Sequence, residues 1–183
     1  MKKILINLTV MTLMGMVSFS QPYNKGTVSV GIGGELLFAN RNLKNTHNTG
    51  FGGTIKGEYV FAKHATATVA SGYYFLGAKK SNIVATENVS AIPLKAGVRY
   101  YLGSFYASGE AGAIFLSRYG AGTSFLWSFG IGDKFTLKRR VYDIGVRHES
   151  WPSESKGNAS VVALRMAYEF SVNQNTSSKR AAF

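Results

Sequence analysis

The chain has 183 residues and carries 21 Lys and Arg against nine Asp and Glu, a formal net charge of +12. Only 16% of its residues are charged, whereas ordinary soluble domains carry roughly 25%. This low charge density argues against an ordinary water-soluble surface. The chain has no cysteine, which excludes disulfides and a cysteine-linked lipid anchor.

The first 20 residues have the pattern of a secretory signal peptide. Lys2 and Lys3 precede an uncharged stretch from Ile4 to Phe19, and Ser18 and Ser20 are the small residues expected before a cleavage site. An uncleaved anchor helix is the alternative, but the stretch is short and no later run of about 20 apolar residues follows. We therefore expect a signal peptide at 1–20, one domain at 21–172 and a polar tail at 173–183.

The rest of the chain contains eight segments in which apolar and polar residues alternate with a period of two, which predicts β-strands. Each segment has about ten to fourteen residues, the length of a tilted strand that crosses a bilayer. We expect strands at Thr27–Phe38, Gly50–Phe61, Ala65–Leu76, Val89–Leu102, Phe105–Leu116, Thr123–Asp133, Val141–Trp151 and Ala159–Val172.

The predicted connections alternate in length, which is typical of barrels in the outer membrane. The mostly short ones are 62–64, 103–104 and 134–140, and the longer polar ones are 39–49, 77–88 and 152–158. Short turns are expected at the periplasmic end and longer loops outside. The connection 118–122 is shorter than this rule prefers, and 134–140 is longer.

Charged residues within the strands lie almost entirely on the face opposite the apolar row. In the last strand, for example, Arg165 and Glu169 alternate with Leu164, Tyr168 and Phe170. The interior of an eight-stranded barrel is just wide enough for side chains to fill, and an unpaired buried charge would cost several kcal/mol. We therefore predict a charge-paired, plugged lumen containing Glu35, Lys56, Glu58, Lys95, Arg99, Glu110, Asp143, Arg147, Glu149, Arg165 and Glu169.

Two strands fit this assignment less well. In the third segment the inward face is ambiguous, and in the fifth Ile114 and Leu116 fall on the polar row. An aqueous pore and a soluble barrel with an apolar lumen remain alternatives.

The remaining basic residues are assigned to the two ends of the barrel. Those at the outer rim could contact the phosphates of outer-membrane lipid or lipopolysaccharide. Because the bases are scattered over both ends of an exported chain, nucleic acid is not an expected partner. The outer group is Arg41, Lys44, Lys79, Lys80, Arg118 and Lys156, and the inner-turn group is Lys63, Lys134, Lys138, Arg139 and Arg140.

The signal peptide, the eight alternating segments and a closing strand that ends Tyr168-Glu169-Phe170 resemble the small outer-membrane β-barrel family, including OmpA-type and OmpX-type barrels. The segments 143–151 and 162–165 look most like the barrel domains of Bacteroidetes-type outer membranes. This resemblance implies an all-β, eight-stranded antiparallel up-and-down transmembrane barrel in the outer membrane. It also implies that Tyr168 and Phe170 form the signal recognised by the barrel assembly machinery.

One pair of residues could carry chemistry. His148 and Ser150 resemble the His-x-Ser element of the lipid A 3-O-deacylase family, in which a histidine activates a serine on the lipid-facing side. Asn158 lies about where that family places an oxyanion-stabilising Asn, but Val162 stands where the family has the Glu that orients the histidine, and Trp151 replaces another Asn. We therefore predict no catalytic residues, and we expect a structural or loop-mediated role with no cofactor and no metal site. The deacylase and a small pore are the alternatives.

Overall fold

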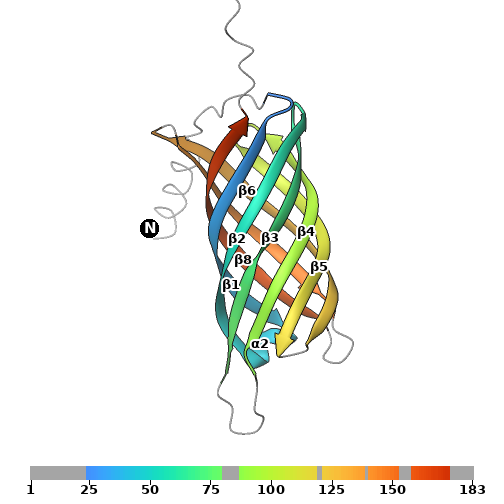
Figure 1. Ribbon diagram of the computed structural model, residues 1–183. Helices are drawn as coiled ribbons and strands as arrows, with labels where there is room; N and C mark the ends of the chain where they lie inside the picture. The colour runs from blue at the N-terminus through green and yellow to red at the C-terminus, as the bar shows by residue number, and fades with distance from the viewer. Residues whose placement is uncertain (1–23, 80–86, 119–120, 139, 153–157, 174–183) are drawn as a thin grey trace, which may run out of the picture.

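The computed structural model describes residues 24–79, 87–118, 121–138, 140–152 and 158–173, which form a closed antiparallel barrel (Figure 1). The predicted signal peptide and almost all of the predicted tail lie outside these residues. No helix among the described residues is long and apolar enough to cross a membrane. The strands are β1 (Val28–Arg41), β2 (His47–Ala62), β3 (Ala65–Ala78), β4 (Val89–Leu102), β5 (Phe105–Arg118), β6 (Gly122–Leu137), β7 (Arg140–Trp151) and β8 (Ala159–Asn173).

Each strand pairs with the next along the chain, and the barrel closes between the first strand and the last. Val30 of β1 pairs with Phe170 of β8, and the pairing continues to Arg41 and Ala159. The predicted all-β, eight-stranded up-and-down fold is therefore confirmed. All backbone groups of a closed sheet are paired between strands, which is what allows strands to cross a bilayer.

The sixth strand is longer than predicted. It continues past Asp133 to Leu137 because Lys134 pairs with Asp143 and Leu137 pairs with Arg140 across the β6–β7 hairpin. The predicted bounds of the turn, 134–140, were wrong, since only residues 138 and 139 separate the two strands.

The two ends of the barrel differ in their connections. At the end where β1 begins and β8 finishes, two-residue turns join the strands, and Gly103 adopts a φ of 70° in one of them. We call this the turn end. The opposite loop end carries the short helix α2 (Asn42–Thr46) and the longer connections (Figure 1). In outer-membrane barrels, short turns face the periplasm and longer loops face outward.

The outer surface is apolar and the lumen is polar over most of its length. Large apolar side chains point outward on every strand; Phe51 is 62% exposed, Val69 59% and Phe129 57%. In the third strand, whose orientation the sequence left ambiguous, Thr66, Thr68 and Tyr74 are buried. Such an apolar exterior is stable against lipid and not against water, so the barrel is a membrane-spanning one.

Candidate functional site

The lumen holds the densest group of charged side chains in the described part of the chain. All eleven residues assigned to the lumen from the sequence lie there, and each is no more than 9% exposed. A twelfth, Lys134, was assigned to an inner turn, which was wrong. It lies on β6, is 2% exposed and points inward, so six acids face six bases. Continuing the alternation of Leu126 and Ser128 along β6 would have identified it.

The twelve groups form one chain of ion pairs in which acids and bases alternate. Eleven ion pairs link them, with nitrogen–oxygen distances from 2.5 Å to 3.7 Å. Each interior member contacts two groups of opposite charge, and only the two terminal members contact one. We call this set the ionic tier; its order is Glu169, Lys134, Glu58, Arg99, Asp143, Arg165, Glu35, Arg147, Glu149, Lys95, Glu110 and Lys56.

This arrangement neutralises the lumen without help from a bound ion. Removing a charge from water costs several kcal/mol, and close pairing with extra hydrogen bonds can offset that cost. Arg147 contributes most: its guanidinium donates to both oxygens of Glu35, to Glu149 and to the Tyr74 hydroxyl. It therefore joins strands β1, β3 and β7 across the lumen.

Three tyrosines belong to the ionic tier's surroundings, and sequence alternation alone did not assign them a role. The Tyr101 hydroxyl donates to Glu58, and the Tyr106 hydroxyl donates to Asp143 at 2.5 Å. The guanidinium of Arg99 lies 4.0 Å from the centre of the Tyr106 ring, a cation–π contact. Tyr74 accepts from Arg147. These rings fill space between charged groups, which a network of short side chains could not do.

Glycines in the wall make room for Tyr106. A methyl group added at Gly145 would lie 2.7 Å from the Tyr106 hydroxyl oxygen, and one at Gly132 would clash with the same ring. Gly132 and Gly145 are paired across β6 and β7. The glycines are therefore required by the close approach of a lumen side chain to the strand backbone.

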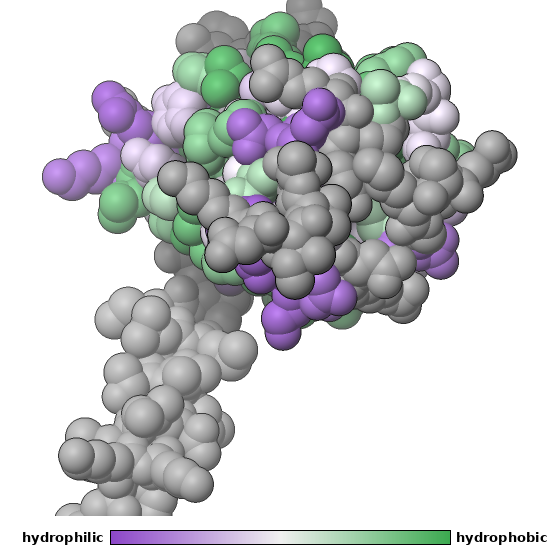
Figure 2. All heavy atoms as spheres, turned by 90° about the horizontal axis from the view of Figure 1, so that it is seen from below, coloured by the Kyte–Doolittle hydropathy of each residue, from purple (hydrophilic) through white to green (hydrophobic). Residues whose placement is uncertain are grey.

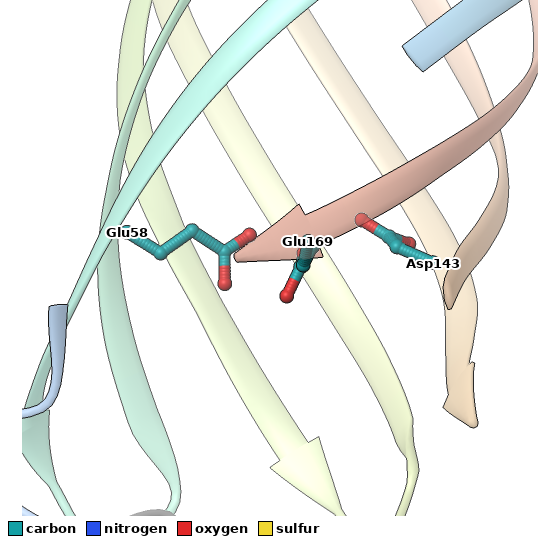
Figure 3. A group of neighbouring side chains, drawn as sticks. All are labelled: Glu58, Asp143 and Glu169. Carbon is teal, nitrogen blue, oxygen red and sulfur yellow. The ribbon is translucent and has the colours of Figure 1, made fainter. Parts of the chain in front are cut away.

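Three carboxylates come close enough together to resemble a cation site. Glu58, Asp143 and Glu169 extend from β2, β7 and β8 toward a common region of the lumen (Figure 3). The ammonium of Lys134 lies 2.6 Å from an oxygen of Glu58 and 2.6 Å from one of Glu169. Arg99 and Arg165 contact Asp143. The chain thus supplies its own cations for this acidic group.

Above the ionic tier, toward the loop end, the lumen filling becomes apolar. The change occurs within single strands: on β1, Glu35 is followed by Leu37, and on β7, Glu149 is followed by Trp151, all facing inward. Leu43 of α2 packs onto the same cluster. We call this set the apolar cap; it comprises Leu37, Leu43, Tyr74, Leu76, Val89, Ala91, Ile114, Leu116, Leu126, Trp151, Ala159, Val161 and Ala163.

Hydrogen bonds of His47 tie the first loop to the second at this end. The ring is 1% exposed, with Nδ1 2.8 Å from the Thr46 hydroxyl and Nε2 2.9 Å from the Glu87 carbonyl. Figure 2, which looks onto the loop end, shows hydrophilic residues at several points with hydrophobic residues between them.

A small cavity lies beside the ionic tier. Its volume is about 20 Å³, and Lys56, Arg99, Tyr106 and Arg165 are among the residues that line it. That is room for about one water molecule.

The two residues that resemble a deacylase element lie at the loop end of β7. The His148 ring packs against Trp127 and Phe129 on the outer surface, with centroids 5.8 Å and 5.4 Å away. Its cross-strand neighbour on β8 is Val162. Ser150 is 4% exposed, and its hydroxyl donates to the Ala159 carbonyl at 3.3 Å.

The two residues of the predicted assembly signal lie on the outer face of β8. Tyr168 is half-buried and Phe170 is exposed, and their rings meet edge to face with centroids 4.5 Å apart. Tyr168 also contacts Tyr142 of β7.

No family model matches the chain, and no curated protein matches it. Solved structures do. The crystal structure of Ail, the attachment invasion locus protein of Yersinia pestis, superposes with a TM-score of 0.53 at 16% identity, covering 80% of this chain and 100% of Ail. The structure of Ail in a phospholipid bilayer nanodisc gives a TM-score of 0.56 at 15% identity, with the same coverage. The chain has the fold of the small outer-membrane β-barrels.

Neisserial surface protein A, NspA, has the same barrel architecture. Its crystal structure gives a TM-score of 0.54 at 15% identity and covers 78% of this chain and 95% of that protein. At this identity the likeness concerns the fold alone. The apolar exterior of this barrel and its fold both place it in the outer membrane.

Proposed function

We propose that this outer-membrane barrel does not conduct, and that its role is structural or exercised through its loops. The observation that supports this is the presence of two lumen fillings in series, the ionic tier and the apolar cap. A path through the barrel would have to displace both buried ion pairs and packed apolar side chains. Breaking a buried pair costs about 3–5 kcal/mol, which disfavours spontaneous opening.

Planar-bilayer recording on the purified barrel tests this proposal. We expect no step conductance from the wild type. The ionic tier and the apolar cap lie one after the other along the lumen. A variant whose cap has smaller side chains, Ile114→Ala/Leu126→Ala, should therefore also show no step conductance. Gel mobility before and after boiling verifies that each protein is folded. Regular single-channel steps from folded wild-type protein would refute the proposal and favour the pore.

We also propose that the barrel is not a lipid A deacylase. A catalytic histidine needs a third group to fix its tautomer and orientation, and the neighbour of His148 across the strands is the apolar Val162. The Ser150 hydroxyl is engaged with a backbone carbonyl. Mass spectrometry of lipid A from cells that express the wild type or Ser150→Ala should give identical acyl patterns. An acyl chain that is lost only when Ser150 is present would overturn this.

A second candidate role is contact with lipopolysaccharide phosphates at the loop end. Lys44 and Lys79 are exposed there, and the Lys79 ammonium donates to the Lys44 carbonyl, so the two bases are adjacent. Ail has been solved with the heparin analogue sucrose octasulfate, itself a polyanion. We expect the wild type to bind vesicles containing diphosphoryl lipid A better than Lys44→Gln/Lys79→Gln does. Equal binding by both proteins would contradict this role.

The assembly of the barrel is proposed to depend on Tyr168 and Phe170. Their edge-to-face rings on the outer face of β8, Tyr168 half-buried and Phe170 exposed, offer the aromatic surface that the barrel assembly machinery is expected to recognise. Phe170→Ala should lower the amount of folded protein in the outer membrane, whereas Phe129→Ala, which alters an exposed ring on β6, should not.

A further inference from the structure

The neutrality of the lumen fixes where the surplus charge of the protein lies. Six acids and six bases cancel within the ionic tier, so the whole formal charge of +12 belongs to the rest of the chain. Fifteen of the 21 bases but only three of the nine acids lie outside the tier. Among the residues that the structure describes, eight bases and two acids lie outside the tier, so the described part of the protein outside the lumen is strongly basic.

At the turn end, exposed bases follow an arc around the rim. Lys25 precedes β1, and the backbone amide of Gly26 donates to the Val60 carbonyl, which places this segment beside the end of β2. Lys63 lies in the β2–β3 turn. Lys138 and Arg140 lie at the β6–β7 turn, next to the end of β8 in the strand order. All four side chains are exposed, and we call them the turn-end basic rim.

Among the residues that the structure describes, one acid outside the lumen lies at this end. Of the two such acids that the structure describes, Glu87 lies in a loop-end connection, and Asp133 is exposed on β6 near the turn end. A single carboxylate cannot neutralise four exposed bases. The turn-end basic rim therefore presents a net positive field, strongest on the arc from β6 through β8 to β3.

Aromatic side chains beside the rim mark the level of the membrane interface. Phe135 and Tyr142 stack with centroids 5.6 Å apart, Tyr142 meets Tyr168 at 5.7 Å, and Tyr168 meets Phe170. Tyr59 and Tyr100 are exposed at the same end of β2 and β4. Such belts occupy the headgroup level of bilayers.

The bases lie just beyond this belt along the strands. Arg140 precedes Tyr142 by two residues, Lys138 follows Phe135 by three, and Lys63 follows Tyr59 by four. Long basic side chains in such positions reach the phosphate level while their methylene stems cover apolar surface. We propose that the turn-end basic rim binds anionic phospholipid headgroups of the inner leaflet, of the phosphatidylglycerol or cardiolipin class.

Anionic lipids fit the rim better than zwitterionic ones do. Both kinds carry a phosphate, but a zwitterionic headgroup also brings a cation, which the rim repels. Each base near an anionic surface contributes roughly a fivefold preference. The proposal concerns the periplasmic end and does not depend on whether the lumen conducts.

Electron paramagnetic resonance of spin-labelled lipids tests the proposal on the barrel reconstituted in phosphatidylcholine bilayers. The measured quantity is the ratio of association of labelled phosphatidylglycerol to labelled phosphatidylcholine at the protein surface. We expect this ratio to exceed one for the wild type and to fall by about half in Lys63→Gln/Arg140→Gln, since only part of the surrounding lipid touches the rim. The preference of the wild type should also vanish in 1 M salt, where screening extends only about 3 Å.

Two further variants test whether the charge of the rim sets the ratio. Lys63→Arg/Arg140→Lys keeps the positive charge at the turn end and should keep the wild-type ratio. Asp133→Asn removes the acid beside the rim and should raise it. A wild-type ratio of one, a ratio insensitive to salt, or an equal loss from the charge-conserving variant would each overturn the proposal. A ratio of one combined with binding of an acidic periplasmic polymer would assign the rim to that partner instead.

Discussion

The ionic tier and the apolar cap fill the same lumen, but different interactions stabilise them. In the tier, each charged group depends on particular partners at hydrogen-bond distance, as Arg147 does on Glu35 and Glu149. In the cap, Leu126 and Ile114 are fully buried by packing that has no directional requirement. The tier therefore tolerates loss of a whole pair better than loss of one member, whereas the cap responds to lost volume.

The largest loss of stability is expected from Arg147→Met, which removes the guanidinium that contacts Glu35, Glu149 and Tyr74. Glu35 and Glu149 lose their shared partner, so we expect the free energy of unfolding to fall by about 3–5 kcal/mol. Urea unfolding of the barrel in phospholipid vesicles, followed by gel mobility without boiling, measures it. Adding Glu35→Gln should recover part of the loss, since one unpaired charge is then gone. A loss below about 1 kcal/mol would mean that the tier is not energetically connected.

The next largest loss of stability is expected in the apolar cap. Leu126→Ala leaves a cavity among its packed side chains. We expect a loss of about 2–4 kcal/mol in the same urea assay. The control is Leu94→Ala, which removes an equal volume from the lipid-facing side of β4, where Leu94 is 49% exposed. Lipid chains can fill that space, so this variant should lose less than half as much. Equal losses would indicate that the cap is loosely packed.

The two fillings also differ in how far the sequence predicts them. Eleven members of the tier follow from alternation, because a charge in the middle of a membrane-spanning strand is stable only on the face away from lipid, whereas the exposed Asp133 lies near the turn end of β6. Lys134 was missed because the strand was ended at Asp133, although its register places it opposite Asp143. The apolar cap, in contrast, shows no alternation of polar and apolar residues in the sequence. Where the lumen is apolar, both faces of a strand are apolar. For that reason Ile114 and Leu116 looked like exceptions.

Partners across the lumen could not be predicted at all. Lys95 on β4 contacts Glu149 on β7, and Lys56 on β2 contacts Glu110 on β5. These strands are not neighbours in the barrel, so neither hairpin register nor sequence spacing fixes which charges meet. Tyr101 and Tyr106 also act through contacts across the lumen, with Glu58 and Asp143, so their roles could not be predicted from the sequence either.

A smaller loss of unfolding free energy is expected where the strand backbone approaches Tyr106, which lies beside the tier. Gly145→Ala would bring a methyl group against the Tyr106 hydroxyl, which Asp143 holds in place. Forcing the ring aside should cost about 1–3 kcal/mol. Gly109→Ala is the matched control, since a methyl group there meets nothing within 4 Å. If both variants were equally stable, Tyr106 would have to be free to move.

The smallest effect is expected from Lys56→Met, at the end of the ion-pair chain. Its removal deprives Glu110 of one partner, but Lys95 still contacts that carboxylate at 3.2 Å. The loss of one charged hydrogen bond is partly offset because a buried ammonium no longer has to be desolvated, so we expect about 1 kcal/mol. Comparing the urea midpoints of Lys56→Met and Arg147→Met thus measures connectivity within the tier at nearly equal burial. If the two losses matched, burial alone would set the cost, and the order of pairs along the chain would have no energetic meaning.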